Sequence, residues 1–310
     1  MTSPPSSILV LGAGEIGTCI LSALNSHPHQ SNHMKISLLL RSSSINTSEP
    51  SKKEQLASFT DLGITLVAGD IANDSPSHLA CIFRNYDCII GASGMYAPSG
   101  TQLKLCHAVL DARVPLYIPW HYGVDYDVIG RGSAQNLFTE QIDVRDALRG
   151  QQETRWVIVS TGMFMSFLFE EFWGVVQRDG AGKVKGVNAL GGWETRVTVT
   201  DVKDIARVIA EVAFVMPETR GIVYAAGDTL SYAEFADLVE EIVRRKIERN
   251  VWTLDYLRGD LEKAPDDSLR KYRIVFGEGR GVAWDKEDSI NVRQGINCMD
   301  AREYAKNILS

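Results

Sequence analysis

Apolar residues in the first half of the chain occur in short, almost unbroken runs, and each run is followed by a segment with helical spacing. Strands that are apolar on both faces are typical of a parallel sheet covered by helices on both sides. The repeated strand–helix order therefore predicts an α/β protein with a Rossmann-type, doubly wound parallel sheet. The predicted strands are residues 8–11, 35–41, 64–70, 88–94, 116–120 and 156–160.

Helices are predicted between these strands, and the pattern changes after about residue 162. From there on, shorter strands are separated by glycines. Residues 1–162 are therefore predicted to form the Rossmann core and residues 163–310 a smaller C-terminal lobe, with some segments returning to the core. Two helices are expected to begin near Pro50 and at Pro76, the second of them capped by Ser75. Further helices are expected over 101–112, 137–149, 201–214 and 231–249. The last of these opens with the capping box Ser231-x-x-Glu234. The expected later strands are 183–187, 196–200 and 222–226.

A glycine-rich turn follows the first predicted strand. Gly12, Gly14 and Gly17 have the spacing of the turn that binds a dinucleotide pyrophosphate. The first glycine permits a tight turn, the second lets backbone N–H groups approach the phosphates, and the third lets the helix pack close to the sheet. Glu15 and Ile16 begin that helix, whose N-terminus favours an anion. A purely structural strand–helix turn is the alternative.

Arg41 stands at the end of the second predicted strand, where NAD-binding proteins usually carry an acidic residue. It is followed by Ser42 and two further serines. A guanidinium beside hydroxyl groups suits the 2′-phosphate of NADP(H), because it can donate charge-assisted hydrogen bonds. The alternative is an arginine whose stem packs at the strand end. The sequence favours NADP(H) over NAD(H), with Ala92, Ser93 and Gly94 flanking the nicotinamide ribose.

Composition restricts the class of partner. The chain has 310 residues, of which 45% are hydrophobic and 23% charged, and its net charge of −7 argues against a nucleic-acid surface. Five cysteines without a C-x-x-C pair predict mostly buried free thiols, and no metal-ligand spacing is present. The most apolar window, 156–176, contains acidic residues and predicts a buried strand followed by a helix. We expect a cytoplasmic protein without a signal peptide, monomeric or homodimeric, that binds a small-molecule substrate and neither nucleic acid nor a membrane.

Several segments together resemble a known family. They are the glycine turn, Arg41, Gly69-Asp70, 118–123, 122–133 and 156–164. The first four are similar to the isoflavone reductase-like branch of the NmrA-like, atypical short-chain dehydrogenase family, and the last two to fungal CipA-like oxidoreductases. The resemblance covers most of residues 6–310 and implies a Rossmann domain, NADPH, and reduction of an aromatic or alkaloid-like molecule. It adds Asp70 and Trp120 to the cofactor-binding candidates.

The acid–base pair common in short-chain dehydrogenases, Tyr-x-x-x-Lys, is missing, because no tyrosine has a lysine four residues later. Isoflavone reductase-like enzymes resemble one another instead in a helix lysine within a Phe-x-x-Lys pattern. The matching segment begins at Phe138 and places Gln141 at the lysine position, where an amide can hydrogen-bond but cannot transfer a proton as an ammonium does. His121 and Tyr122, after the fifth strand, join Gln141 as catalytic candidates. A backbone-bonded loop histidine and a packed aromatic ring are the alternatives.

Residues 1–162 are thus expected to bind NADP(H) and residues 163–310 mainly the substrate. Four apolar residues of the second part are expected to line a pocket for a polycyclic ligand: Met163, Phe164, Phe167 and Trp193. Each of them alone is equally consistent with ordinary core. The leading hypothesis is an NADPH-dependent reductase that transfers a hydride to a C=N or C=C bond of a bulky aromatic or alkaloid-like secondary-metabolite intermediate. Two alternatives remain: a cyclase or isomerase that uses the same pocket with NADP(H) bound, and a non-catalytic NmrA-like regulator that senses dinucleotides.

Overall fold

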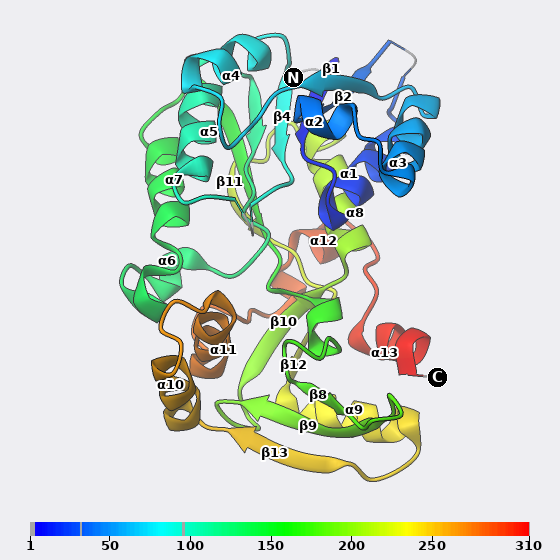
Figure 1. Cartoon of the computed structure of the whole chain (residues 1–310), viewed down its shortest axis with the longest axis vertical. Coiled ribbons are helices and arrows are strands. Elements are labelled where there is room, and N and C mark those ends of the chain that lie inside the picture. Colours follow the sequence, from blue (N-terminus) through cyan, green and yellow to red (C-terminus); the bar gives the residue numbers. More distant parts are fainter. Residues whose placement is uncertain (1–3, 32, 95–96, 310) are drawn as a thin grey trace. The chain divides into compact units, whose positions relative to one another are not determined.

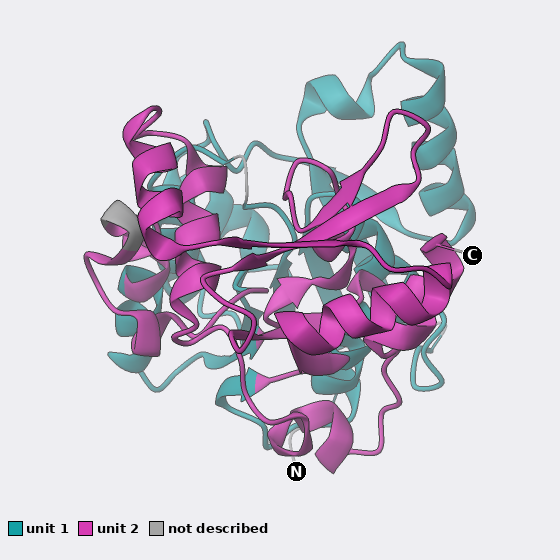
Figure 2. Cartoon of the chain, turned by 90° about the horizontal axis from the view of Figure 1, so that it is seen from below, with its two compact units in different colours: residues 1–121, 143–159, 205–223 teal, residues 122–142, 160–204, 224–310 magenta. Residues whose placement is uncertain are grey.

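The strand that precedes the glycine turn, β1 (Ser7–Leu11), lies inside a seven-stranded sheet. The computed structural model describes residues 4–31, 33–94 and 97–309 (Figure 1). Contacts divide the chain into two units (Figure 2). Unit 1 contains residues 1–121, 143–159 and 205–223, and unit 2 contains residues 122–142, 160–204 and 224–310. That residues 1–162 bind the cofactor and 163–310 mainly the substrate stays a prediction.

The sheet of unit 1 has the order β11-β6-β5-β4-β1-β2-β3. The neighbouring pairs from β6 to β3 are parallel, so the predicted Rossmann-type sheet is confirmed. The chain order reverses between β1 and β4, and such a switch point is where open α/β sheets bind ligands, outside the carboxyl ends of the strands. The other strands are β2 (Lys35–Leu40), β3 (Thr65–Ala68), β4 (Cys88–Gly91), β5 (Leu116–Ile118), β6 (Arg155–Ser160) and β11 (Gly221–Tyr224).

Helices cover both faces of this sheet. Phe83, Leu105 and Leu148 of α4, α5 and α7 share one buried core with Ile89 and Tyr117 of the strands, and these helices lie on one side of the sheet in Figure 1. α1 and α8 lie on the other side. The helices are α1 (Glu15–Asn25), α2 (Ser42–Ile45), α3 (Pro50–Asp61), α4 (Pro76–Phe83), α5 (Thr101–Asp111), α7 (Thr139–Arg149) and α8 (Val202–Phe214), of which α7 and α8 begin in residues of unit 2.

Local capping explains where two of these helices begin. The Ser75 hydroxyl accepts the N–H of His78 at 3.2 Å, so the predicted start of α4 is confirmed. The segment after β2, for which the sequence predicted no helix, forms α2. The reason is that the N–H groups of Ser44 and Ile45 donate to the carbonyl of Arg41 at 2.8 and 3.1 Å, which makes Arg41 the N-cap residue.

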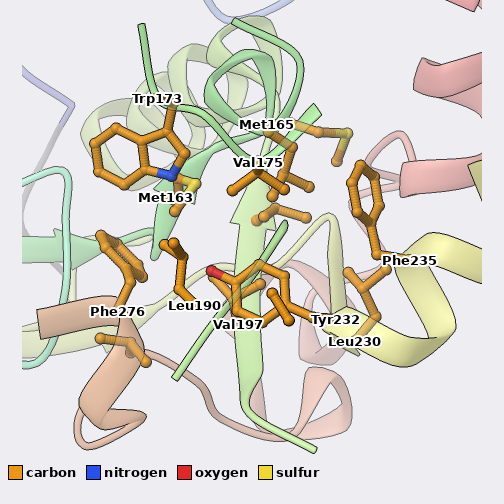
Figure 3. Packing of buried hydrophobic residues seen from close by; sticks show 14 of the residues in the cluster. Met163, Met165, Trp173, Val175, Leu190, Val197, Leu230, Tyr232, Phe235 and Phe276 are labelled. Atoms are coloured by element: carbon orange, nitrogen blue, oxygen red, sulfur yellow. The ribbon is translucent and has the colours of Figure 1, made fainter. Parts of the chain in front are cut away.

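Unit 2 contains two three-stranded sheets with the orders β12-β10-β7 and β13-β9-β8. Trp173, Tyr232, Phe235 and Phe276 are buried in its core, together with aliphatic residues and methionines (Figure 3). The strands are β7 (Met163–Phe164), β8 (Val176–Arg178), β9 (Val184–Leu190), β10 (Arg196–Thr200), β12 (Asp228–Ser231) and β13 (Glu248–Trp252). The helices are α6 (Tyr126–Ile129), α9 (Tyr232–Val243), α10 (Leu254–Glu262), α11 (Ser268–Glu278), α12 (Ile290–Arg293) and α13 (Ala301–Leu309), with single 3₁₀ turns at Ser133–Asn136, Met165–Leu168 and Lys286–Asp288.

Two predictions for this part of the chain are wrong. The helix expected over 231–249 opens with the predicted capping box but ends at Val243, because Arg244 takes a left-handed conformation (φ 55°) and residues 248–252 pair with β9. The helix expected after the sixth strand is also missing. The chain there forms β7, which pairs with β10, and then a single 3₁₀ turn.

Within the described part of the chain, every helix is too short or too polar to cross a membrane.

Candidate functional site

The glycine turn after β1 is closely packed at two of its three glycines. Gly12 has φ 105°, and a Cβ there would overlap the Ser93 hydroxyl. A Cβ on Gly17 would overlap the carbonyl oxygen of Gly12. Glycine is therefore required at both positions by contacts within unit 1, whether or not a ligand is bound.

Gly14 is different, because nothing in the described protein fills the space beside it. A Cβ built on Gly14 would meet no heavy atom within 4 Å apart from its chain neighbours. Gly14 is the N-cap residue of α1, has φ −70° and provides no side-chain cap. Ile16 is buried and Glu15 is exposed, so the first turn presents backbone rather than bulky apolar groups. This open cradle at the positive end of a helix fits the pyrophosphate of a dinucleotide.

Arg41 and Ser42 are exposed at the start of α2. The Asp70 carboxylate after β3 accepts the N–H groups of Ala72 and Asn73 at 2.9 and 3.2 Å and the Asn73 side-chain amide at 2.9 Å. The side-chain hydrogen bond from Asn73 lowers the pKa of Asp70, and the charge of Arg41 lowers it further. Asp70 therefore shapes its own loop, and its predicted contact with the cofactor stays a prediction.

The loop after β4 lies against Trp120, which follows β5. A Cβ on Gly94 would overlap the Trp120 indole ring, and a Cβ on Gly91 would lie 2.7 Å from the Trp120 nitrogen. The Gln102 side chain donates to the Ser93 carbonyl at 2.9 Å and holds this loop in place. Ala92, Ser93, Gly94 and Trp120 therefore gather at the carboxyl ends of β4 and β5, the edge of the sheet where ligands bind.

The catalytic candidates His121 and Tyr122 follow β5 directly. His121 is fully buried and Tyr122 is 6% exposed. The carbonyl of the next residue, Gly123, accepts the N–H groups of Thr161 and Gly162 at 2.9 and 3.0 Å. The candidate loop is thus joined to the segment that follows β6. Gln141 is half-buried in the first turn of α7, and the predicted catalytic roles of all three candidates stay predictions.

Asp125 fixes the far end of the same loop. Its carboxylate accepts the N–H groups of Asp127 and Val128 at the start of α6, and also the hydroxyl of Tyr224 at 2.6 Å. Its own N–H donates to the Gly281 carbonyl at 2.8 Å. A loop anchored at both ends can hold Tyr122 in one orientation, as a reacting group requires.

Three of the four substrate candidates lie together in unit 2. Met163 is buried, and the half-buried rings of Phe164 and Phe167 are 5.6 Å apart. Phe167 also contacts Phe172 and Trp173, each at 5.5 Å between ring centroids. These last two residues were missed by sequence reasoning, because they lie in an irregular turn without periodicity.

Trp193 lies elsewhere in unit 2, in the connection between β9 and β10. The Arg249 guanidinium lies 5.9 Å from the centre of its ring, and its carbonyl accepts the N–H of Ala233 at 3.0 Å. These contacts tie Trp193 to β13 and α9. Its predicted role in binding substrate stays a prediction.

Cysteine and metal chemistry add little to the site. All five cysteines are free. Burial raises the pKa of the Cys106 thiol to about 12 and that of Cys88 further still, so both are unreactive. The expectation of mostly buried thiols is too general, since Cys81 is exposed and two others are half-buried. The described residues contain no group of three or more side chains arranged to hold a metal ion.

Comparison with known proteins identifies related chains. Residues 4–281 match the model of the NmrA-like family. The chain is 48% identical over 307 residues to an NmrA-like family domain-containing oxidoreductase of Gibberella moniliformis, covering 97% of this chain and 98% of that one. Its fold is similar to that of AtPrR2 with NADP⁺ and (+)-pinoresinol (TM-score 0.79, 18% identity, all of both chains). It is also similar to that of an isoflavone reductase (TM-score 0.79, 19% identity, 99% of both chains).

Proposed function

Because the chain belongs to the NmrA-like family, we propose that it is an NADPH-dependent reductase of a bulky aromatic or alkaloid-like small molecule. The observation that carries the proposal is the open space at Gly14. Contacts within the protein require glycine at positions 12 and 17 but not at position 14, so a bound ligand explains the glycine at position 14. Relatives of this chain are named as oxidoreductases and reductases, which supports the reaction class.

Each group of candidates has a defined task in this proposal. Backbone N–H groups from Gly14 to Gly17 bind the pyrophosphate, and Arg41 with Ser42 binds the 2′-phosphate through charge-assisted hydrogen bonds. Ala92, Ser93, Gly94 and Trp120 flank the nicotinamide ribose. The bound cofactor supplies a hydride, while the protein orients it and excludes water.

The substrate side of the proposal rests on the aromatic group in unit 2. Met163, Phe164 and Phe167 provide apolar area for a flat, polycyclic molecule, with Phe172 and Trp173 beside them. Trp193 is proposed to extend this surface. A ligand that stacks on these rings is bound through buried apolar surface and aromatic stacking rather than through charge.

His121 and Tyr122 are the proposed proton donors, because Gln141 cannot perform the proton transfer that a lysine would. A C=N bond that already carries a positive charge needs no acid, and such an iminium substrate fits a site without the lysine. This argument favours C=N reduction, with C=C reduction as the other option.

Gln141 also favours a second candidate function. An enzyme that keeps NADP(H) bound while it shapes a cyclisation or isomerisation would need no ammonium group at that position. The two functions differ in whether the cofactor is consumed.

The test measures NADPH oxidation by the purified protein with imines, enones, a lignan such as (+)-pinoresinol and an isoflavone. We expect oxidation with at least one class and formation of a reduced product. Product formation at the same rate with NADP⁺ and with NADPH would establish the cyclase or isomerase instead. Binding of NADPH without turnover of any class would contradict both.

A further inference from the structure

Thr161 lies directly after the carboxyl end of β6, and its backbone is fixed on both sides. Its N–H donates to the Gly123 carbonyl at 2.9 Å, and its carbonyl accepts the hydroxyl of Thr200 at 2.8 Å. The next residue, Gly162, has φ 71°, and a Cβ there would overlap the Thr198 carbonyl oxygen. Two segments of unit 2, the loop at Gly123 and strand β10, thus hold this position in a single conformation.

The Thr161 hydroxyl is not used by these contacts. The residue is fully buried, and its Oγ1 atom has no hydrogen-bond partner among the described residues. Leaving a buried hydroxyl without a partner costs free energy, and most such groups in folded proteins are paired. Valine has the same shape and would fill the position without that cost, so packing alone does not account for threonine.

Position decides what this hydroxyl can do, as the opposite end of β6 shows. Thr154, just before the strand, is buried as well. Its backbone N–H and carbonyl form hydrogen bonds with the Gln151 side chain, and its Oγ1 atom, like that of Thr161, has no partner among the described residues. Thr154 lies at the amino end of a parallel strand, where ligands do not bind. Thr161 lies at the carboxyl end, where they do.

The surroundings of Thr161 within unit 2 are those of the proposed substrate site. Its bond to Gly123 joins it to the residue next to the catalytic candidate Tyr122. Met163 and Phe164 follow two and three positions later and form β7, which pairs with Val199 and Thr200. Met163 and Phe164 are apolar and the Thr200 hydroxyl is already bonded to the Thr161 carbonyl, so the Thr161 hydroxyl is a polar group that a largely aromatic molecule could meet there.

We infer that the Thr161 hydroxyl donates a hydrogen bond to an oxygen or nitrogen atom of the substrate. The inference rests on the proposed reductase function and narrows its substrate class to molecules with an acceptor atom at or next to the bond that is reduced. A neutral imine nitrogen or the carbonyl oxygen of an enone can accept this bond. An iminium nitrogen has no lone pair, so an iminium substrate would need an oxygen acceptor beside the C=N bond. Thr161 binds and orients that atom, and it transfers no proton.

The experiment compares three variants with the wild type, using the compound of the turnover panel that the wild type reduces fastest. Thr161→Val removes the hydroxyl and keeps the shape, Thr161→Ser keeps the hydroxyl, and Thr154→Val is the matched control at the other end of β6. We expect Thr161→Val to lower kcat/KM about 10- to 100-fold, the effect of losing one hydrogen bond to a reacting substrate. Thr161→Ser and Thr154→Val are expected to stay within about threefold of the wild type.

Cofactor affinity and thermal stability separate this role from a structural one. The NADPH Kd of Thr161→Val should match that of the wild type, because no existing bond is removed. The Tm of the ligand-free variant should be equal to or higher than that of the wild type, because a buried hydroxyl without a partner is replaced by a methyl group. Unchanged kcat/KM in Thr161→Val would overturn the inference, as would a matching loss in Thr161→Ser or a parallel loss of NADPH affinity. Absence of turnover in the wild type would instead refute the proposed function itself, before any variant is compared.

Discussion

Replacing Gly14 with alanine tests the proposed cofactor site most directly. A methyl group at this position meets no heavy atom within 4 Å beyond the chain neighbours, and φ −70° is accessible to alanine. The same methyl group projects roughly 1.5 Å into the open space before the first turn of α1. We therefore expect Gly14→Ala to fold normally and to lose cofactor.

The two parts of this expectation have different magnitudes. Alanine restricts the unfolded chain, which stabilises by about 0.4–1 kcal/mol, but it is a poorer N-cap residue than glycine by a similar amount. The free energy of unfolding should therefore change by less than about 1 kcal/mol. A phosphate oxygen must come within roughly 2.9 Å of a backbone N–H, and each charge-assisted hydrogen bond contributes about 1.5–3 kcal/mol. Losing about 3 kcal/mol weakens the NADPH Kd roughly 100-fold.

The assay is calorimetric titration of NADPH into the wild type and Gly14→Ala, with thermal unfolding of the ligand-free proteins alongside. Gly180→Ala is the matched control, because Gly180, in the turn between β8 and β9, also has open space beside it. Gly17→Ala provides a contrast, since its methyl group would overlap the Gly12 carbonyl oxygen and should destabilise the fold itself. The control should match the wild type in both measurements.

Wild-type affinity in a folded Gly14→Ala would refute the placement of the pyrophosphate. A large loss of stability in the ligand-free Gly14→Ala would refute the premise that the protein leaves this space open. Only weak binding by a folded variant agrees with both steps of the argument.

Three further predictions concern other parts of the structure. Arg41→Ala should weaken the NADPH Kd about tenfold and leave the NADH Kd unchanged, because only NADPH carries the 2′-phosphate; equal weakening in titrations of both would contradict the NADP(H) assignment. Gly94→Ala should lower the free energy of unfolding by about 1–3 kcal/mol and weaken NADPH binding, because its methyl group would overlap the Trp120 ring; denaturant titration showing unchanged stability would contradict that packing. Hydrogen bonds from Lys246, the larger cause, and from Arg249 hold the pKa of Glu240 at about 2, against 4.5 for a free glutamate. The stability that Glu240 contributes is therefore present above pH 4.5 and is lost as the pH falls toward 2. Glu240→Gln should therefore flatten the fall of the urea midpoint over that acid range, and an unchanged slope would contradict the pairing.

The sequence predicted the elements of unit 1 well because their signals are local. Residues 8–11 are buried on both faces, so an uninterrupted apolar run identified β1. The glycine spacing and the cap at Ser75 are also local. The short helix α2 was missed because three of its four residues are serines, which favour loops as readily as helices, and because its hydrogen bonds to the Arg41 carbonyl come from backbone N–H groups, which leave no mark in the sequence.

Unit 2 was predicted less well because its elements depend on distant partners. Four of the five residues of β13 are exposed, so neither an apolar run nor an alternation marks it, and its pairing with β9 joins segments some sixty residues apart. Helix α9 ends at Arg244, which takes a left-handed conformation. Glycine is the usual residue in that conformation, so the arginine gave no sign that the helix ends there. Likewise, Phe172 and Trp173 join Phe167 only through the path of an irregular turn.

Gly14 and Thr161 share one property that connects the two sites. At each position, contacts within the protein would permit another residue. Packing requires glycine at positions 12 and 17 but not at position 14. The hydroxyls of Thr198 and Thr200 are hydrogen-bonded within the protein, whereas that of Thr161 has no partner among the described residues. A ligand explains both choices, a phosphate in unit 1 and an acceptor atom in unit 2. Because the two ligands are different molecules, Gly14→Ala should change the NADPH Kd alone, and Thr161→Val should change kcat/KM at saturating NADPH alone. A double variant should then show the product of the two effects on kcat/KM at low NADPH, and a clear departure from that product would mean that the two positions serve one ligand.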